Sequence, residues 1–344
     1  MTETAALARA STLPASWYRD PEIWERERHA IFAKEWTLFG REAQFPAPGS
    51  YLAGEVAGWP VFAIRDRDGA LKAFHNVCRH RAGPIVWDGE GRCDVLRCRY
   101  HGWVYDTAGN LRRTPDFGEA EDFDKARFSL FPVRVESWRG LVFVNLDADA
   151  APLADWIGAL DDETAPYPIE DYRFHGEVVH EIACNWKTYV DNYAEGYHVR
   201  DVHPGLDREI DSGAYEVLLK DRYAVHQAPQ RSGASYTGLW VWRFPTLALN
   251  VYDDGMNVER MVPVGHDRTR LVYNFFFRDT SEAAQDRIAA SLAISREVTL
   301  EDARICEAVQ RNLDAGIYEA GRLSPRHENG VWFFHALVRQ ALAA

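Results

Sequence analysis

Apolar and polar positions divide the chain into a short helical segment, a region of short strands and a mixed region. Residues 21–35 begin with Pro21 and place Ile23, Trp24 and Ile31 at roughly helical spacing. Proline loses no hydrogen bond in the first turn of a helix, and the apolar positions give one partial face. We therefore expect a helix here, in an N-terminal segment, 1–35, that packs with the C-terminal part of the chain.

The pattern changes between residues 36 and 146, where short apolar runs alternate with Gly, Asp and Pro. Asp68-Gly69 and Ala108-Gly109-Asn110 are typical turn sequences between such runs. This pattern predicts an all-β domain over 36–150. The small, acidic segment 147–156 is the expected boundary.

The remainder, 151–344, mixes both periodicities. A helix is expected over 184–200, and another over 281–315 that begins near Thr280 or Ser281 and ends at Gly316. Six strand-like segments precede the second helix: 174–183, 215–227, 236–243, 247–253, 257–263 and 268–278. The predicted fold is α+β, with an antiparallel sheet wrapped around a long C-terminal helix.

Composition narrows the functional classes. The chain has 344 residues, 47% of them hydrophobic, and a formal net charge of −13. An acidic balance without a basic run argues against a nucleic-acid partner. The N-terminal sequence does not resemble a signal peptide, and no apolar stretch approaches the roughly 18 residues of a membrane span. We expect a cytoplasmic protein with no membrane partner.

Two short motifs pair one cysteine with one histidine: Cys78-Arg79-His80 and Cys98-Arg99-Tyr100-His101. Two thiolates and two imidazoles suit a [2Fe–2S] cluster in which one iron takes the cysteines and the other the histidines. The alternative is a structural zinc site, but zinc motifs usually pair like with like. The other three of the five cysteines are expected to be buried small hydrophobes. These are Cys93, Cys184 and Cys306.

A second group of candidate ligands lies in the predicted helix over 184–200. Asp191, Glu195 and His198 are spaced at i, i+4 and i+7, so they are expected to share one helix face. His203 follows just before Pro204, where the helix should end. Two histidines need one carboxylate from elsewhere to bind a non-haem Fe(II) with open positions for O2.

Asp302 in the second predicted helix is the candidate for that carboxylate. It lies three positions before Ile305, and Ile305, Val309 and Leu313 are expected to form one apolar face. A carboxylate on an inward-facing position needs a metal or a charged partner. Spacing alone leaves open that these histidines are structural and that Asp302 is solvated.

The segment NVCRHRAG…CRYHGWVYD resembles the Rieske domain of ring-hydroxylating oxygenases. The resemblance implies that Cys78 and Cys98 bind the inner iron of a Rieske cluster, and that His80 and His101 bind the outer, exposed iron. It also implies that Trp103 packs beside the cluster loop.

The segment NWKTYVDNYAEGYHVRDVHPGL is similar to the N-x3-D-x2-H-x4-H region of the same family, and EDARICE follows in the family's order. The resemblance covers nearly the whole chain. It implies that His198, His203 and Asp302 bind a mononuclear Fe(II).

Two positions depart from the family pattern. Glu195 stands where Asp is usual, and Asp191 where Asn is frequent. By resemblance, Glu195 links His198 to His101 of a neighbouring subunit. Asp191 is a second candidate catalytic residue, because a carboxylate near a metal centre can orient a histidine. In having glutamate at position 195, the chain resembles the family members that act on quaternary ammonium compounds.

The implied function is the oxygenase component of a multicomponent enzyme. A separate flavin or ferredoxin-type reductase supplies electrons from NAD(P)H, and the enzyme uses O2 to mono- or dihydroxylate, demethylate or cleave a small aromatic or quaternary ammonium substrate. We expect the two centres of one chain to lie too far apart for fast transfer, which a head-to-tail homotrimer, α3, would solve. The rival functions are a Rieske electron carrier with a non-catalytic ligand-binding C-terminal domain, and a zinc-stapled binding protein.

Six residues are candidates for the substrate pocket, with core packing as the competing role for each. Strand alternation places the first three on one face. An aromatic cage near a carboxylate would favour a trimethylammonium substrate, and an Arg or Asn clamp would favour an aromatic acid. The candidates are Trp240, Trp242, Phe244, Leu249, Tyr252 and Met256.

Overall fold

The computed structural model describes residues 6–231 and 238–343. The chain forms two compact units. One unit is Phe32–Gly158, and the other combines Met1–Ile31 with Ala159–Ala344. The segment before residue 32 therefore belongs to the same unit as the C-terminal part of the chain.

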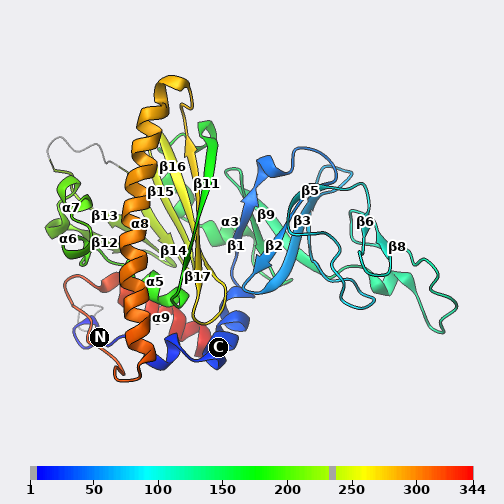
Figure 1. Ribbon diagram of the computed structural model, residues 1–344, viewed down its shortest axis with the longest axis horizontal. Helices are drawn as coiled ribbons and strands as arrows, with labels where there is room; N and C mark the ends of the chain where they lie inside the picture. Colours follow the sequence, from blue (N-terminus) through cyan, green and yellow to red (C-terminus); the bar gives the residue numbers. More distant parts are fainter. Residues whose placement is uncertain (1–5, 232–237, 344) are drawn as a thin grey trace. The chain divides into compact units, whose positions relative to one another are not determined.

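The unit Phe32–Gly158 is built from antiparallel strands, as the sequence predicts (Figure 1). One sheet has the order β1-β10-β9-β4-β3-β2-β5, and a smaller sheet has the order β6-β7-β8. The strands are β1 Thr37–Arg41, β2 Ser50–Val56, β3 Trp59–Arg65, β4 Leu71–His75, β5 Gly89–Arg92, β6 Leu96–Arg97, β7 Val104–Tyr105, β8 Leu111–Arg113, β9 Pro132–Trp138 and β10 Leu141–Asn145.

Strand β3 shows how this unit builds two cores. Side chains alternate along a strand, so Phe62 and Ile64 point to one face and Val61 and Ala63 to the other. All four are fully buried. The face with Phe62 belongs to the same hydrophobic core as Cys78 and Cys98, so this core supports the Cys/His loops.

The second unit contains an antiparallel sheet in the order β11-β17-β16-β15-β14-β13-β12, with the long helix α8 along it (Figure 1). This confirms the predicted sheet-and-helix arrangement. The run predicted over 215–227 is two strands, because the polar residues 220–222 form a turn. Residues 236 and 237 of the strand predicted over 236–243 lie outside the described residues. The strands are β11 Arg173–Ile182, β12 Glu216–Leu219, β13 Tyr223–Gln227, β14 Leu239–Arg243, β15 Leu247–Tyr252, β16 Gly255–Pro263 and β17 Thr269–Phe277.

Helix α8, Gln285–Asp314, and the helix at Pro21 confirm two predictions. The Asp20 side chain caps α2, Pro21–Glu27, by accepting from Glu22 N, and a π-helical turn, η2, continues to Phe32. The remaining helices are α3 Leu153–Ile157, α4 Leu160–Thr164, α5 Trp186–Tyr193, α6 Val199–Val202, α7 Leu206–Glu209, α9 Asn329–Ala343, η1 Ala15–Tyr18, η3 Glu42–Gln44, η4 Lys125–Phe128, η5 Ile169–Asp171, η6 Ser212–Ala214 and η7 Glu282–Ala284.

Helix α9 was not predicted, although its apolar face is well developed. Val331, Phe334 and Val338 are buried, and the Phe334 ring lies 5.5 Å from both the Trp186 and Trp242 rings. Helix α9 therefore helps to cover the sheet. Within residues 6–231 and 238–343, no helix has both the length and the hydropathy needed to cross a bilayer.

Candidate metal centres and substrate cavity

Two loops of the β unit bring the Cys/His motifs together. Cys78 and His80 follow β4, and Cys98 and His101 lie between β6 and β7. Each loop folds back on its cysteine, since Cys78 N donates to Gly83 O and Cys98 N donates to Trp103 O, both at 2.9 Å. Backbone hydrogen bonds of this kind fix the direction of a side chain before any ligand binds.

The side chains on these loops are arranged as the cluster requires. Cys78 and Cys98 are each 3% exposed, whereas His101 is exposed. The His80 and His101 rings lie 4.6 Å apart, and Trp103 stacks on His80 at 4.8 Å with 9° between the planes. The predicted position of Trp103 beside the loop is thus seen in the structure.

His80 carries the observation that tests the fit of a metal cluster. Its Nδ1 is buried and has no hydrogen-bond partner among the described residues. A buried polar atom without a partner costs about 1–3 kcal/mol unless a ligand satisfies it. Burial lowers the pKa of His80, and the neighbouring His101 and Arg81 act in the same direction. The imidazole is therefore neutral, which is the form that binds a metal.

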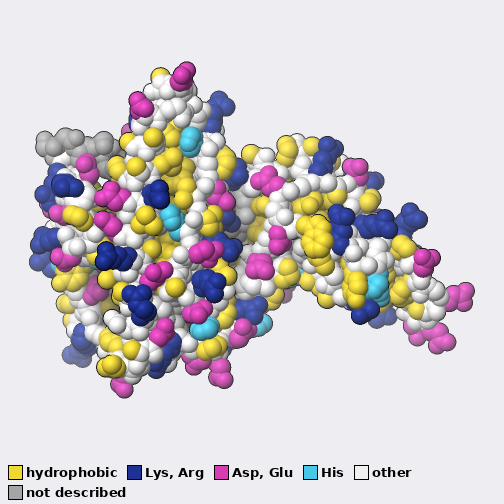
Figure 2. All heavy atoms as spheres, in the orientation of Figure 1, with side chains coloured by type: hydrophobic (Ala, Val, Ile, Leu, Met, Phe, Trp, Pro, Cys, Tyr) yellow, Lys and Arg dark blue, Asp and Glu magenta, His cyan; other side chains and the backbone are white. Residues whose placement is uncertain are grey.

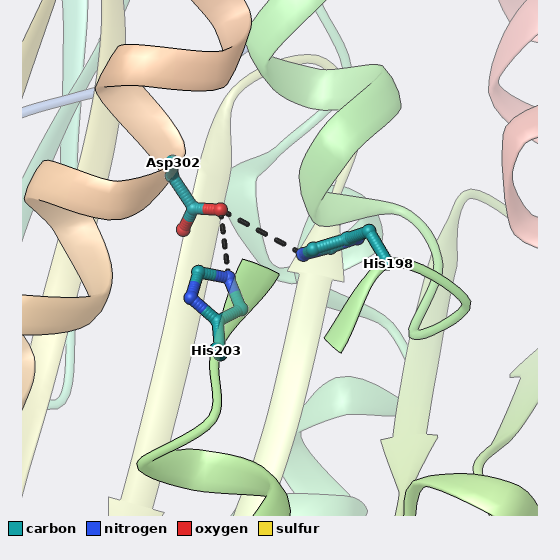
Figure 3. A group of neighbouring side chains, drawn as sticks. All are labelled: His198, His203 and Asp302. Carbon is teal, nitrogen blue, oxygen red and sulfur yellow. Dashed lines mark hydrogen bonds and ion pairs between the residues drawn. The ribbon is translucent and has the colours of Figure 1, made fainter. Parts of the chain in front are cut away.

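His198, His203 and Asp302 meet in the second unit, although α8 supplies the aspartate and loops supply the histidines (Figure 3). Each offers one ligand atom, and these atoms lie within 4.8 Å of one another. Asp302 Oδ1 lies 2.9 Å from His203 Nε2 and 3.6 Å from His198 Nε2. Two imidazoles and one carboxylate are the donor set of a facial Fe(II) site.

The opposite nitrogens of both imidazoles are held by carboxylates. His198 Nδ1 lies 2.6 Å from Glu195 Oε1, and His203 Nδ1 lies 2.7 Å from Glu301 Oε2. Burial lowers the pKa of His203, but hydrogen bonds to Asp302 and Glu301 outweigh it, so the pKa is raised. Such partners orient metal-binding histidines and increase their basicity.

Sequence reasoning missed two residues of this centre. Glu301 is adjacent to Asp302 on α8, and its acidic side chain beside a candidate ligand was the available signal. Asn192 Nδ2 donates to Asp302 Oδ1 at 2.7 Å, across 110 positions of the chain. No local pattern could have assigned Asn192 to that carboxylate.

The helix predicted over 184–200 is wrong in its second half. α5 ends at Tyr193, and Gly196 packs so closely on Tyr215 that a β-carbon would lie 2.4 Å from the ring. The chain leaves the helix there, so Glu195 and His198 do not share a helix face with Asp191. Asp191 instead accepts from Tyr18 Oη at 2.5 Å and lies 2.7 Å from His335 Nε2. Asp191 thus contacts a histidine, but not a candidate metal ligand.

The predicted apolar face beside Asp302 also needs correction. Asp302 and Leu313 are buried, but Ile305 is 39% exposed and Val309 is 41% exposed. Both line a cleft of about 760 Å³ that also contains Asp191. The residue spacing was right for a helix, but that side of α8 is not covered by the sheet of its own chain.

A cavity of about 160 Å³ opens on the His198–His203–Asp302 group. Its floor is one cross-strand row of the sheet, His226–Trp240–Asn250–Asn257, in which each residue is paired with the next. Tyr252, Glu259 and Tyr273 of the same sheet extend this floor, and the other walls come from α5, α8 and the segments between α5 and β13. The aromatic lining residues are Tyr189, Tyr193, Tyr215, His226, Trp240, Tyr252 and Tyr273.

Two of the six predicted pocket residues, Trp240 and Tyr252, line this cavity. Trp240 Nε1 donates to Tyr252 Oη at 3.1 Å, so the two rings are held together. Every second side chain of these strands points to the cavity face, as expected for a strand.

The other four predicted pocket residues lie outside the cavity. Trp242 and Phe244 are on the same face as Trp240 but are fully buried, and Trp242 packs against Phe334 of α9. Leu249 and Met256 are buried on the opposite face, because each lies one position out of phase with the cavity residues. For these four, core packing is the role that the structure shows.

Two buried titratable groups of the cavity have strongly shifted pKa values. Burial lowers the pKa of His226 to about 4, so this imidazole is neutral at neutral pH. Burial raises the pKa of Glu259 to about 8, although hydrogen bonds from Tyr273 and Tyr189 act against the rise. Neither residue was singled out from the sequence.

A relay cluster in one unit and a single reaction iron in another is the division of labour of Rieske-type oxygenases, and this is the class that the fold and the two centres define. The comparisons identify the family. The chain belongs to the family of ring hydroxylating alpha subunits (catalytic domain), whose model matches residues 169–344, and residues 35–129 match the Rieske [2Fe-2S] domain. It is an oxidoreductase that incorporates oxygen and carries a Rieske cluster and a mononuclear iron.

The similar proteins cover nearly the whole chain. Choline monooxygenase from Beta vulgaris is 29% identical over 346 residues, covering 97% of this chain and 77% of the relative. The carnitine monooxygenase oxygenase subunit of Escherichia coli (strain K12) is 29% identical over 354 residues, covering 96% and 94%.

Solved structures agree with this fold. The quaternary ammonium Rieske monooxygenase CntA with L-carnitine has a TM-score of 0.85 and 29% identity, covering 99% of both chains. Naphthalene 1,2-dioxygenase with indole has a TM-score of 0.77 and 19% identity, covering 100% of this chain and 95% of that one. The second likeness shows a shared fold alone.

Proposed function

We propose that this chain is the oxygenase component of a Rieske-type monooxygenase whose substrate is a small quaternary ammonium compound. The composition of the cavity is the observation that carries the substrate class. Among its described lining residues are aromatic rings and three acids, Glu195, Glu259 and Asp302, and no lysine or arginine. Aromatic faces attract cations, and an acidic lining without basic residues has the same preference.

The alternative is an aromatic acid held by an Arg or Asn clamp. The cavity contains Asn250 and Asn257, but Asn250 Nδ2 donates to Asn257 Oδ1 at 2.8 Å. Tyr193 Oη donates to Asn250 Oδ1 at 3.1 Å. These amides are engaged with one another, so they form no clamp for a carboxylate. The similar enzymes are named for choline and carnitine, and both are quaternary ammonium compounds.

The residues of the chain have distinct tasks in this proposal. When bound, the Rieske cluster supplies electrons one at a time and the mononuclear Fe(II) supplies a position for O2. Cys78, His80, Cys98 and His101 hold the first group. The second is held by His198, His203 and Asp302. Glu195 and Glu301 keep both imidazoles oriented, and the cavity walls position the substrate carbon and exclude water.

Glu195 is proposed to link two subunits of a homotrimer. One carboxylate oxygen is bonded to His198 Nδ1, and the side chain also lines the cleft of about 760 Å³. That cleft contains Asp191, Glu195 and Glu328, whereas the cluster loops present exposed Arg81 and Arg99. Complementary charge favours docking of a neighbour's cluster loop here, with His101 of that neighbour near Glu195.

Exposed apolar side chains support the same contact. Ile305 and Val309 reach the surface along α8, and Tyr100 of the cluster loop is 56% exposed. Figure 2 shows hydrophobic side chains at the surface over α8. Exposed apolar residues beside a charged rim are typical of protein interfaces. Native mass spectrometry of the loaded protein should give a trimer, and a monomer would contradict this part of the proposal.

The substrate class is tested by turnover. The iron-loaded enzyme is supplied with NADH and a Rieske-oxygenase reductase, and O2 uptake and product are measured with choline, carnitine, γ-butyrobetaine, glycine betaine and a set of aromatic acids. We expect product in proportion to O2 consumed with at least one quaternary amine. Coupled turnover of aromatic acids alone would overturn the proposed substrate class.

A further inference from the structure

Glu259 lies on β16 at the floor of the cavity and is 1% exposed. It is paired across the sheet with Tyr273 on one side and with Ala248 on the other. Tyr273 Oη donates to Glu259 Oε1 at 2.8 Å, and Thr299 Oγ1 donates to Tyr273 Oη at 3.2 Å. Glu259 lines the cavity, and the hydrogen bond from the tyrosine fixes the direction of its carboxyl group.

Glu259 is the acid of the cavity that no positive group neutralises. Glu195 is bonded to His198, and Asp302 is bonded to His203. The hydrogen-bond partners of Glu259 are phenol hydroxyls, and no lysine, arginine or histidine in the described part of the chain forms an ion pair with it.

The surroundings of Glu259 make its charge depend on a bound cation. The ionisable groups that face it are Tyr189 from α5, Tyr273 from β17 and Asp302 from α8. Burial raises the pKa of Glu259, and the nearby Asp302 acts in the same direction. A desolvated carboxylate without a cation is unfavourable, and a cation in the same cavity reverses that balance.

We propose that Glu259 is the charge partner of the substrate's cationic group and selects a cationic substrate over an uncharged molecule of the same shape. The aromatic rings recognise the methyl groups around the nitrogen, but a neutral tert-butyl group has almost the same shape. The aromatic faces favour the cation to some extent, and Glu259 adds most of the preference, because only the cation compensates the buried carboxylate. This inference rests on the proposed quaternary ammonium substrate.

The test compares each quaternary amine with its carbon isostere, in which a quaternary carbon replaces the nitrogen. Choline, carnitine and γ-butyrobetaine are titrated into anaerobic, iron-loaded enzyme by calorimetry, followed by their isosteres. We expect the wild type to bind the cation about 10- to 100-fold more tightly than the isostere, the lower part of the range for one desolvated charge contact. In Glu259→Gln this ratio should fall by about tenfold through weaker binding of the cation, and the preference that remains comes from the aromatic faces.

Two further variants separate charge from structure. Glu259→Asp keeps the charge and should retain at least part of the discrimination. Glu216→Gln removes an exposed carboxylate from β12, the edge strand of the same sheet, and should leave the ratio unchanged. Each ratio is measured within one protein preparation, so a lower folded fraction does not alter it. The mononuclear iron content reports how much of the unit that contains Glu259 is folded in every sample.

The outcomes distinguish this inference from the proposed function. Glu259 is not the charge partner if Glu259→Gln keeps the wild-type affinity ratio. The same follows if its affinity for the isostere falls as much as its affinity for the cation. The proposed substrate class still holds in both cases. If no quaternary amine binds the wild type while an aromatic acid does, the proposed function itself fails.

Discussion

The cluster loops and the reaction centre obtain their geometry by opposite routes. The four Cys/His residues lie between positions 78 and 101, and loop backbones orient them through short-range hydrogen bonds such as Cys78 N to Gly83 O. The reaction centre joins His203 to Asp302 across 99 positions, and side-chain carboxylates orient its imidazoles. A local motif is therefore readable in the sequence, whereas a centre assembled across the fold depends on how α8 lies on the sheet.

The largest expected effect tests whether the two centres are independent. Asp302→Ala should remove the mononuclear iron and abolish product while the cluster spectrum remains, because the cysteines lie in the other unit. Cys98→Ala should abolish the cluster and also product, but leave the mononuclear iron. Metal analysis together with electron paramagnetic resonance measures both. Loss of both centres in either variant would break the comparison, and Glu297→Ala, an exposed acid on α8, is the control.

Glu195→Gln sharpens the comparison, because Glu195 is the residue proposed to connect the two kinds of centre. Both metal contents should stay at wild-type levels, since Gln still contacts His198. Single-turnover product formation should fall by about 100-fold, the upper range for residues that support metal ligands. Glu195→Asp, the usual family residue, should retain more activity. Unchanged turnover in Glu195→Gln would show that the carboxylate link is not needed.

Glu301→Gln should have a smaller effect, confined to the reaction centre. The side chain orients His203 through Nδ1, and its charge contributes to the raised pKa of that imidazole. Affinity for Fe(II) should fall by about tenfold, as is usual for such outer partners. Metal titration of the chelated protein measures this, and the cluster spectrum should not change. Glu297→Gln, on an exposed face of the same helix, is the matched control.

The smallest expected effect concerns pH and Glu259. Its pKa is about 8 in the folded chain against 4.5 as the ordinary value, so the folded state binds more protons between these values. Stability contributed by the protonated group is present at low pH and decreases as pH rises from 4.5 to about 8. Glu259→Gln should lack this decrease.

The measurement is the difference in melting temperature between wild type and Glu259→Gln, with the mononuclear iron removed by a chelator. Relative to the wild type, the melting temperature of the variant should increase by a few degrees as pH rises from 4.5 to about 8. A difference in melting temperature that is constant across pH would show that folding does not raise the pKa of Glu259. Glu216→Gln should follow the wild type at every pH.

Much of the fold and of both centres follows from local sequence. The Cys/His motifs, the two histidines near Pro204 and the helix that carries Asp302 were all identified by residue type and spacing, and the β domain by its short apolar runs. These features are local because a strand, a helix or a tight loop is decided by neighbours within a few residues.

The tertiary structure alone decided which side chains meet. α5 ends at Tyr193 and the chain then passes close to Tyr215 at Gly196, so Asp191 and Glu195 do not share a helix face. Trp240 and Trp242 share one face of β14, but α9 covers Trp242, so Trp242 lies in the core while Trp240 faces the cavity. Asn192 and Glu259 gained their roles from partners on other elements. The sequence determined the kinds of element and the metal-binding chemistry, and long-range packing determined the cavity, because side-chain contacts between distant segments have no periodic signal along the chain.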